Sequence, residues 1–91
     1  MSFDTVHNYY ERLVFNEINE NYLEKELDSQ QLADMACIAL NRIPPRYIRF
    51  DIDMSFYMTT DEHKEHEEIV RKAVRKAYKK LLKLDRDETD E

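Results

Sequence analysis

Three arginines gather in the middle of the sequence, beside residues suited to a flat, negatively charged ligand. Residues 26–63 contain no other lysine or arginine. A guanidinium is a planar fork of N–H donors that matches the oxygens of a phosphate or a carboxylate, an aromatic face can stack on a flat ring, and an amide can bond its edge. The stretch therefore predicts an anion-binding site, whose members are Asn41, Arg42, Arg46, Tyr47 and Arg49.

Each of these residues also has a purely structural interpretation. Asn41 stands near a predicted helix end, where its amide can bond the last unsatisfied carbonyls. Tyr47 can cover the core while its hydroxyl stays in water. Arg46 and Arg49 can pair with the aspartates of the strand predicted to follow them, and such cross-strand ion pairs contribute only ~0.2–1 kcal/mol. The sequence leaves both interpretations open.

A first amphipathic helix is predicted over residues 5–25, with Asp4 as its N-cap. Two polar residues, Glu17 and Asn21, fall inside its apolar arc. They either lie near the solvent edge of the arc or mark a face that meets a polar ligand or a partner chain. The apolar arc consists of Val6, Tyr10, Leu13, Val14 and Ile18.

A second helix is predicted to begin after a cap at Asp28 or Ser29 and to end before Pro44, because a residue preceding proline is pushed out of the helical region. Cys37 lies among its small and apolar residues and is predicted to be a small packed side chain. The buried stripe consists of Leu32, Met35, Ala36, Ala39 and Leu40.

Beyond the prolines the pattern changes to a period of two over residues 48–58, which is typical of a half-buried strand. A third helix is predicted from a cap at Thr60 to Leu84, followed by an acidic tail over residues 85–91. The chain is thus a single domain over residues 1–84, mostly α with one strand, in the order helix, helix, strand, helix.

A lone strand has no partner for its backbone N–H and C=O groups, and residues 47–58 contain no hairpin turn signal. We therefore expect the strand to pair with its copy in a homodimer, antiparallel about a two-fold axis, which would also duplicate the arginines.

Composition excludes several classes of protein. Twenty acidic and fourteen basic residues give a formal charge of −6, so general nucleic-acid binding is not expected. The absence of glycine excludes Gly-rich phosphate loops, and a single cysteine excludes a disulfide framework and a cysteine-rich zinc site. The longest charge-free stretch, residues 35–41, is too short to span a bilayer. With no signal-peptide pattern, we expect a cytoplasmic protein that is not an enzyme.

Two features of the third predicted helix have more ordinary explanations than a site. His63 and His66 are one turn apart, but no complementary pair of ligands is evident, so we expect a partly buried helix start and no metal or cofactor. A row of lysines and arginines along the same helix could bind a membrane surface or nucleic acid, although a solvated helix face commonly has this composition.

Residues 33–47, Ala-Asp-Met-Ala-Cys-Ile-Ala-Leu-Asn-Arg-Ile-Pro-Pro-Arg-Tyr, resemble the signature of the late-competence ComFB family. Asn8, Glu11 and Val14 match the family's Asn-x-x-Glu-x-x-Val pattern, so the resemblance covers about residues 6–50. It implies a small, mostly helical dimer without catalytic activity, which acts as a receptor for cyclic di-GMP or cyclic di-AMP in competence, motility or surface behaviour. The cysteine cluster of some members is missing from residues 24–29, so zinc is not carried over.

On this resemblance the predicted ligand is a cyclic dinucleotide, and a downstream protein effector receives the signal. The predicted ligand-binding residues are Asn8, Glu11, Asn41, Arg42, Arg46, Tyr47 and Arg49. Asn8 and Glu11 are otherwise ordinary helix-surface residues. The alternative function is a protein–protein adaptor of the competence or pilus machinery that binds no small ligand.

Overall fold

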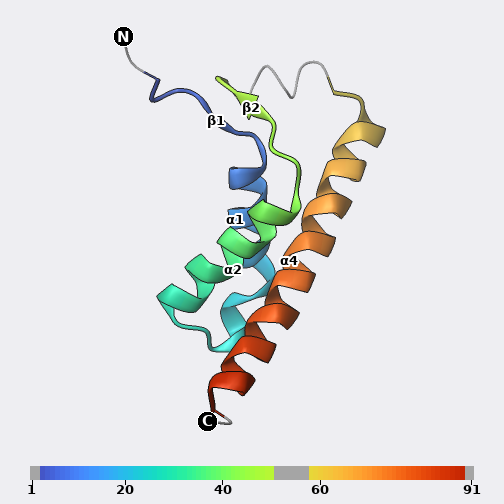
Figure 1. The fold of residues 1–91 in the computed structure, drawn as a ribbon. Helices are drawn as coiled ribbons and strands as arrows, with labels where there is room; N and C mark the ends of the chain where they lie inside the picture. The colour runs from blue at the N-terminus through green and yellow to red at the C-terminus, as the bar shows by residue number, and fades with distance from the viewer. Residues whose placement is uncertain (1–2, 51–57, 90–91) are drawn as a thin grey trace.

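The computed structural model describes residues 3–50 and 58–89, with the side chains of the last helix described as far as Leu84. Three helices dominate the fold, and α1 and α2 pack against the long α4 (Figure 1). A two-stranded sheet lies at the end of the molecule near the N-terminus (Figure 1). In chain order the elements are β1 (His7–Asn8), α1 (Tyr10–Asn21), the 3-10 helix η1 (Leu23–Lys25), α2 (Ser29–Arg42), β2 (Tyr47–Ile48) and α4 (Thr60–Thr89).

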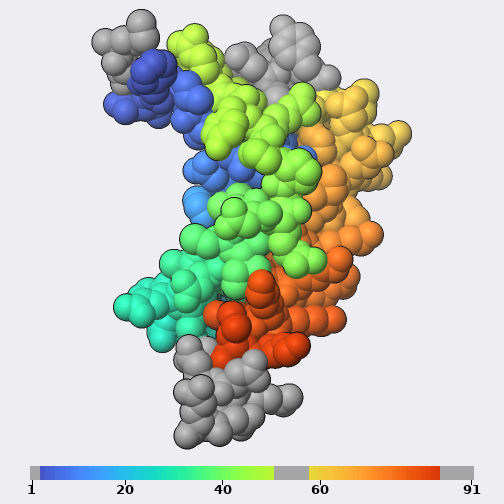
Figure 2. Space-filling view, viewed as in Figure 1, coloured from blue at the N-terminus to red at the C-terminus, as the bar shows by residue number. Residues whose placement is uncertain are grey.

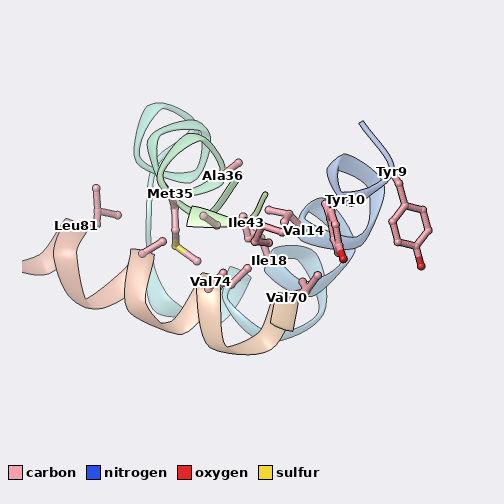
Figure 3. Close-up of a cluster of buried hydrophobic side chains, with 13 residues drawn as sticks. Tyr9, Tyr10, Val14, Ile18, Met35, Ala36, Ile43, Val70, Val74 and Leu81 are labelled. Atoms are coloured by element: carbon pink, nitrogen blue, oxygen red, sulfur yellow. The ribbon is translucent and has the colours of Figure 1, made fainter. Parts of the chain in front are cut away.

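The core lies where the three helices meet, and each of them contributes one fully buried large side chain. These are Val14 of α1, Met35 of α2 and Val74 of α4 (Figure 3). The small Ala39 and Ala77 are also fully buried, which allows the helix backbones to approach closely. The predicted apolar stripe of α2 is confirmed. That of the first helix is confirmed except at Val6, which is exposed and precedes the helix.

The start of α2 is fixed by a capping box. The Asp28 carboxylate accepts a hydrogen bond from the Gln31 backbone N–H at 2.7 Å, and the Gln31 side-chain oxygen accepts from the Asp28 backbone N–H at 2.9 Å. Two donors that the helix cannot satisfy are thus paired with each other's side chains. At the other end Ile43 is extended, as expected for a residue before proline. The predicted boundaries of this helix are confirmed.

The beginning of the chain differs from the prediction. The first helix spans Tyr10–Asn21 rather than residues 5–25, so Asp4 is not its cap and residues 23–25 form the separate 3-10 helix η1. His7 and Asn8 are instead extended and pair antiparallel with β2, with His7 opposite Ile48 and Asn8 opposite Tyr47. The periodicity of residues 5–9 fits a helix, but the backbone partner available in β2 favours an extended conformation.

This pairing changes the argument for a dimer. The predicted strand over residues 48–58 needed a second copy to pair its backbone, yet Tyr47 and Ile48 pair within their own chain. Residues 51–57 of the predicted strand lie outside the described residues. The homodimer therefore remains a prediction that this two-stranded sheet does not require.

Three smaller differences concern the helices. Thr59, not Thr60, caps α4, because its hydroxyl accepts from the Glu62 backbone N–H at 3.1 Å. The α4 backbone continues to Thr89, beyond Leu84 where we expected the helix to end. Cys37 is exposed rather than packed. In the described part of the chain, no helix is both long and apolar enough to cross a membrane.

Candidate functional site

Asn8 is the one polar residue among the buried residues described, with 8% of its surface exposed. Its side-chain oxygen accepts hydrogen bonds from two backbone N–H groups, those of Tyr10 at 3.2 Å and Arg46 at 3.0 Å. The first bond satisfies the N–H group of the first residue of α1, and the second holds the segment that leads into β2. Asn8 therefore joins two parts of the chain that are far apart in sequence.

Glu11 completes this arrangement. Its carboxylate accepts from the Asn8 backbone N–H at 3.1 Å, which is one half of a capping box. The other half is missing, because the Asn8 side chain accepts from Tyr10 and Arg46. The Tyr9 backbone N–H also donates to the Arg46 carbonyl at 2.7 Å, which fixes Arg46 by both of its backbone groups. The two family-pattern residues thus bind backbone, and neither is a simple helix-surface residue.

The side chains that follow this anchored point are exposed. Arg46, Tyr47 and Arg49 all lie at the surface, and 67% of the Tyr47 surface is accessible. The Arg49 guanidinium carbon lies 5.1 Å from the centroid of the Phe50 ring, which is a cation–π distance. The aspartates suggested as pairing partners lie outside the described residues. This segment, yellow-green in Figure 2, forms part of the surface beside the N-terminal residues.

Asn41 and Arg42 occupy the last turn of α2. The Asn41 amide donates to the Cys37 carbonyl at 2.9 Å. Asn41 thus bonds to helix backbone, although this carbonyl lies before the last four of α2 that we expected it to satisfy. Arg42 is exposed at the end of the helix, where a cation is favoured by the helix dipole. The side chains of Asn8, Glu11 and Asn41 thus bond to backbone. Asn41 is exposed, as are the other four predicted residues.

Sequence reasoning missed a cluster beside the sheet that links α1 to α4. The Tyr9 hydroxyl lies 3.1 Å from His66 Nδ1 and 3.7 Å from the Met58 sulfur. The rings of Tyr9, Tyr10 and His66 pack edge to face, with centroids 5.0 to 5.8 Å apart. His66 is half-buried, so the prediction of a partly buried helix start is confirmed for it. Only the three-dimensional fold brings these residues together.

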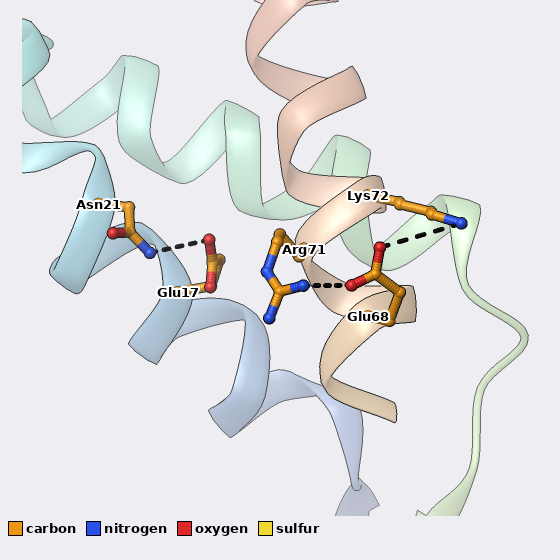
Figure 4. A network of polar contacts seen from close by, with 5 residues as sticks. All are labelled: Glu17, Asn21, Glu68, Arg71 and Lys72. Carbon is orange, nitrogen blue, oxygen red and sulfur yellow. Dashed lines mark hydrogen bonds and ion pairs between the residues drawn. The ribbon is translucent and has the colours of Figure 1, made fainter. Parts of the chain in front are cut away.

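A groove between α1 and α4 is the second feature that emerges from the fold. A narrow part of about 290 Å³ and a wider part of about 700 Å³ share Glu17 and Arg71 in their walls. Glu17 accepts a hydrogen bond from the Asn21 amide at 2.9 Å, and Arg71 contacts Glu68 of its own helix (Figure 4). The polar residues in the apolar arc of the first helix were the sequence signal for this groove.

Two tyrosines meet in the wider part of the groove. The ring centroids of Tyr22 and Tyr78 are 5.2 Å apart, with their planes at 57°. Burial raises the pKa of the Tyr22 hydroxyl above 10.0, and the negative charge of Glu17 raises that pKa further, whereas Arg75 opposes the shift. The Tyr22 hydroxyl is therefore neutral throughout the physiological range of pH.

Comparison with known proteins points to one family. The family model described as late competence development protein ComFB matches residues 7–84 of this chain. The match begins at β1 and ends within α4, so it extends beyond the sequence motif to the third helix. No curated protein matches the chain.

Proposed function

Because the chain belongs to the ComFB family, we propose that it is a non-enzymatic receptor for a cyclic dinucleotide, cyclic di-GMP or cyclic di-AMP. The observation that carries this proposal is the exposure of Arg46, Tyr47 and Arg49 on a segment whose backbone is anchored at Arg46. A cyclic dinucleotide offers two phosphates and two flat bases, which are the partners that guanidinium groups and an aromatic ring recognise.

Anchoring the backbone matters because an ordered segment loses less conformational entropy when a ligand binds. Asn8 and Glu11 supply that order from beneath, while Asn41 stabilises the end of the helix that carries Arg42. We thus assign direct ligand contacts to the three arginines and Tyr47, and supporting roles to Asn8, Glu11 and Asn41. In the proposed homodimer the contacts occur twice, which matches the two-fold symmetry of the ligand.

As a receptor, the protein would act in the cytoplasm, where ligand binding would change its interaction with a protein effector. The ligand must bind one arrangement of the dimer more tightly than another, since a ligand without such a preference shifts no equilibrium.

Isothermal titration calorimetry with both cyclic dinucleotides and their linear counterparts tests the proposal. We expect saturable binding of a cyclic form, and Arg46→Ala should weaken it by ~1.5–3 kcal/mol, about 10- to 150-fold, because a charge-assisted contact is lost. Arg12→Ala removes an exposed arginine from α1 and is the matched control.

Two results would count against the proposal. If no cyclic dinucleotide gives heat or a thermal shift, the adaptor function is favoured instead. If Arg46→Ala and Arg12→Ala bind the ligand equally well, the assigned site is wrong. Light scattering at micromolar concentration tests the dimer separately, and a monomeric mass would contradict it.

A further inference from the structure

The wider part of the α1–α4 groove has an apolar floor. Tyr22 of the α1–η1 turn and Tyr78 of α4 are both half-buried and line it together. Leu82, one turn further along α4, continues the floor and has 45% of its surface exposed. Tyrosine and arginine are among the residues that most often anchor a protein partner at the centre of an interface.

The rim of the wider part is basic, whereas three carboxylates and one cation line the narrow part. Four cations and one carboxylate, Glu17, line the wider part, in a protein whose formal charge is −6. The cations are Lys25, Arg71, Arg75 and Lys79. Among the described side chains, only Arg71 of these four has a carboxylate within salt-bridge distance. The rim therefore favours a negatively charged occupant.

The spacing of the cations indicates the form of that occupant. Arg71, Arg75 and Lys79 follow one another at every fourth residue of α4, so they form a row about 12 Å long with one charge per turn. Carboxylates repeated at the same interval on a second helix can face such a row, whereas one phosphate group cannot reach along it. The tyrosine planes, inclined at 57°, also do not form a parallel slot for a nucleotide base.

From this geometry we propose that the α1–α4 groove docks an acidic amphipathic helix of a partner protein. The apolar side chains of that helix contact Tyr22, Tyr78 and Leu82, and its glutamates or aspartates pair with Arg75, Lys79 and Lys25. The site is separate from the exposed arginines near β2, and it needs no cyclic dinucleotide. It goes beyond the proposed receptor function by assigning a surface and a chemistry to the protein partner.

A fluorescein-labelled peptide of about 14 residues, roughly four helical turns, is a suitable probe. Leucines at positions i, i+4 and i+7 form one face, and glutamates flank them. A scrambled peptide of equal composition is the first control, because it keeps the charge and removes the apolar face. Fluorescence polarisation against the full chain measures the affinity, and two-dimensional NMR identifies the residues whose signals shift.

Two double substitutions on the same helix separate the groove from general electrostatics. Arg75→Glu with Lys79→Glu reverses two charges of the rim, and Lys76→Glu with Lys80→Glu reverses two exposed charges of the adjacent row, which does not line the groove. We expect the rim pair to weaken peptide binding by about tenfold or more and the adjacent pair by less than about threefold. Circular dichroism tests whether both variants remain folded. Arg75→Gln with Lys79→Gln is a milder pair that should also weaken peptide binding.

Three outcomes would overturn the proposal. The scrambled peptide could bind as tightly as the designed one, or the two double variants could weaken binding equally, and either result would indicate diffuse charge attraction. Binding of guanosine monophosphate with shifts at Tyr22 and Tyr78, in the absence of peptide binding, would assign the groove to a small molecule. The peptide experiment is independent of the proposed receptor function, because the peptide contains no nucleotide. A protein that binds no cyclic dinucleotide could still bind the peptide.

Discussion

The junction between α1 and β2 and the groove between α1 and α4 use polar side chains in opposite ways. At the junction, Asn8 is buried and its oxygen already accepts two backbone hydrogen bonds. Along the groove, Lys25, Arg75 and Lys79 are exposed and have no carboxylate partner among the described side chains. The first arrangement stabilises the fold and leaves little capacity for a ligand, whereas the second contributes little to the fold and leaves its charges available.

The largest loss of stability should follow from removing the side-chain amide of Asn8 at the junction. Asn8→Ala leaves the N–H groups of Tyr10 and Arg46 without their acceptor, and we expect a loss of about 2–4 kcal/mol in the free energy of unfolding. Urea denaturation measures it. Asn8→Asp keeps an acceptor oxygen and should lose less, while Arg46→Ala keeps the backbone N–H and should change stability by under about 0.5 kcal/mol. Equal losses for Asn8→Ala and Arg46→Ala would contradict the contrast between the regions.

A smaller change in stability is expected when two cations of the groove are replaced by neutral residues. Arg75→Gln combined with Lys79→Gln should change the free energy of unfolding by less than about 0.5 kcal/mol, because exposed charges without partners contribute little to stability. Thermal and urea unfolding of the double variant measure the change. A destabilisation above about 1 kcal/mol would mean that these cations support the fold, and the distinction between the two regions would fail.

The smallest effect concerns the protonation of Tyr22. Its pKa in the folded state is raised above 10.0, mainly by burial, so the folded chain keeps the phenol proton when the unfolded chain has lost it. The stabilising contribution is therefore fully present below pH 10 and is lost as the pH rises through the folded-state pKa. Urea denaturation of the wild type and of Tyr22→Phe at pH 8 and pH 10.5 measures it. We expect the stability of the variant to fall less between these pH values than that of the wild type. Equal falls would show that folding does not raise the pKa of Tyr22.

The sequence predicted the elements whose signals are local and periodic. The start of α2 was predictable because Asp28 and Gln31 form a capping box three residues apart, and its end because Pro44 follows. The buried faces of α1 and α2 were predictable from helical periodicity. β1 was not predictable, because a two-residue strand depends on a distant backbone partner near Arg46.

The site was predicted only in part, and Asn8 shows the reason. Its spacing to Glu11 matches both a family pattern and the geometry of a helix cap, and sequence spacing alone does not separate ligand contact from backbone capping. The interpretation of Asn41 as a backbone bond was available from its place near a helix end. Glu17 and Asn21 marked the groove, but the meeting of Tyr22 with Tyr78 depends on how the helices pack.

A single unbroken helix carries one wall of the groove and also reaches the sheet. Tyr9, the neighbour of Asn8, touches α4 at His66, and Lys79 lies thirteen residues further along the same helix, a distance of about 20 Å. Residues 66–79 contain no glycine or proline, so α4 has no hinge along this stretch. A tilt of α4 at His66 would therefore also move Lys79, which lines the groove.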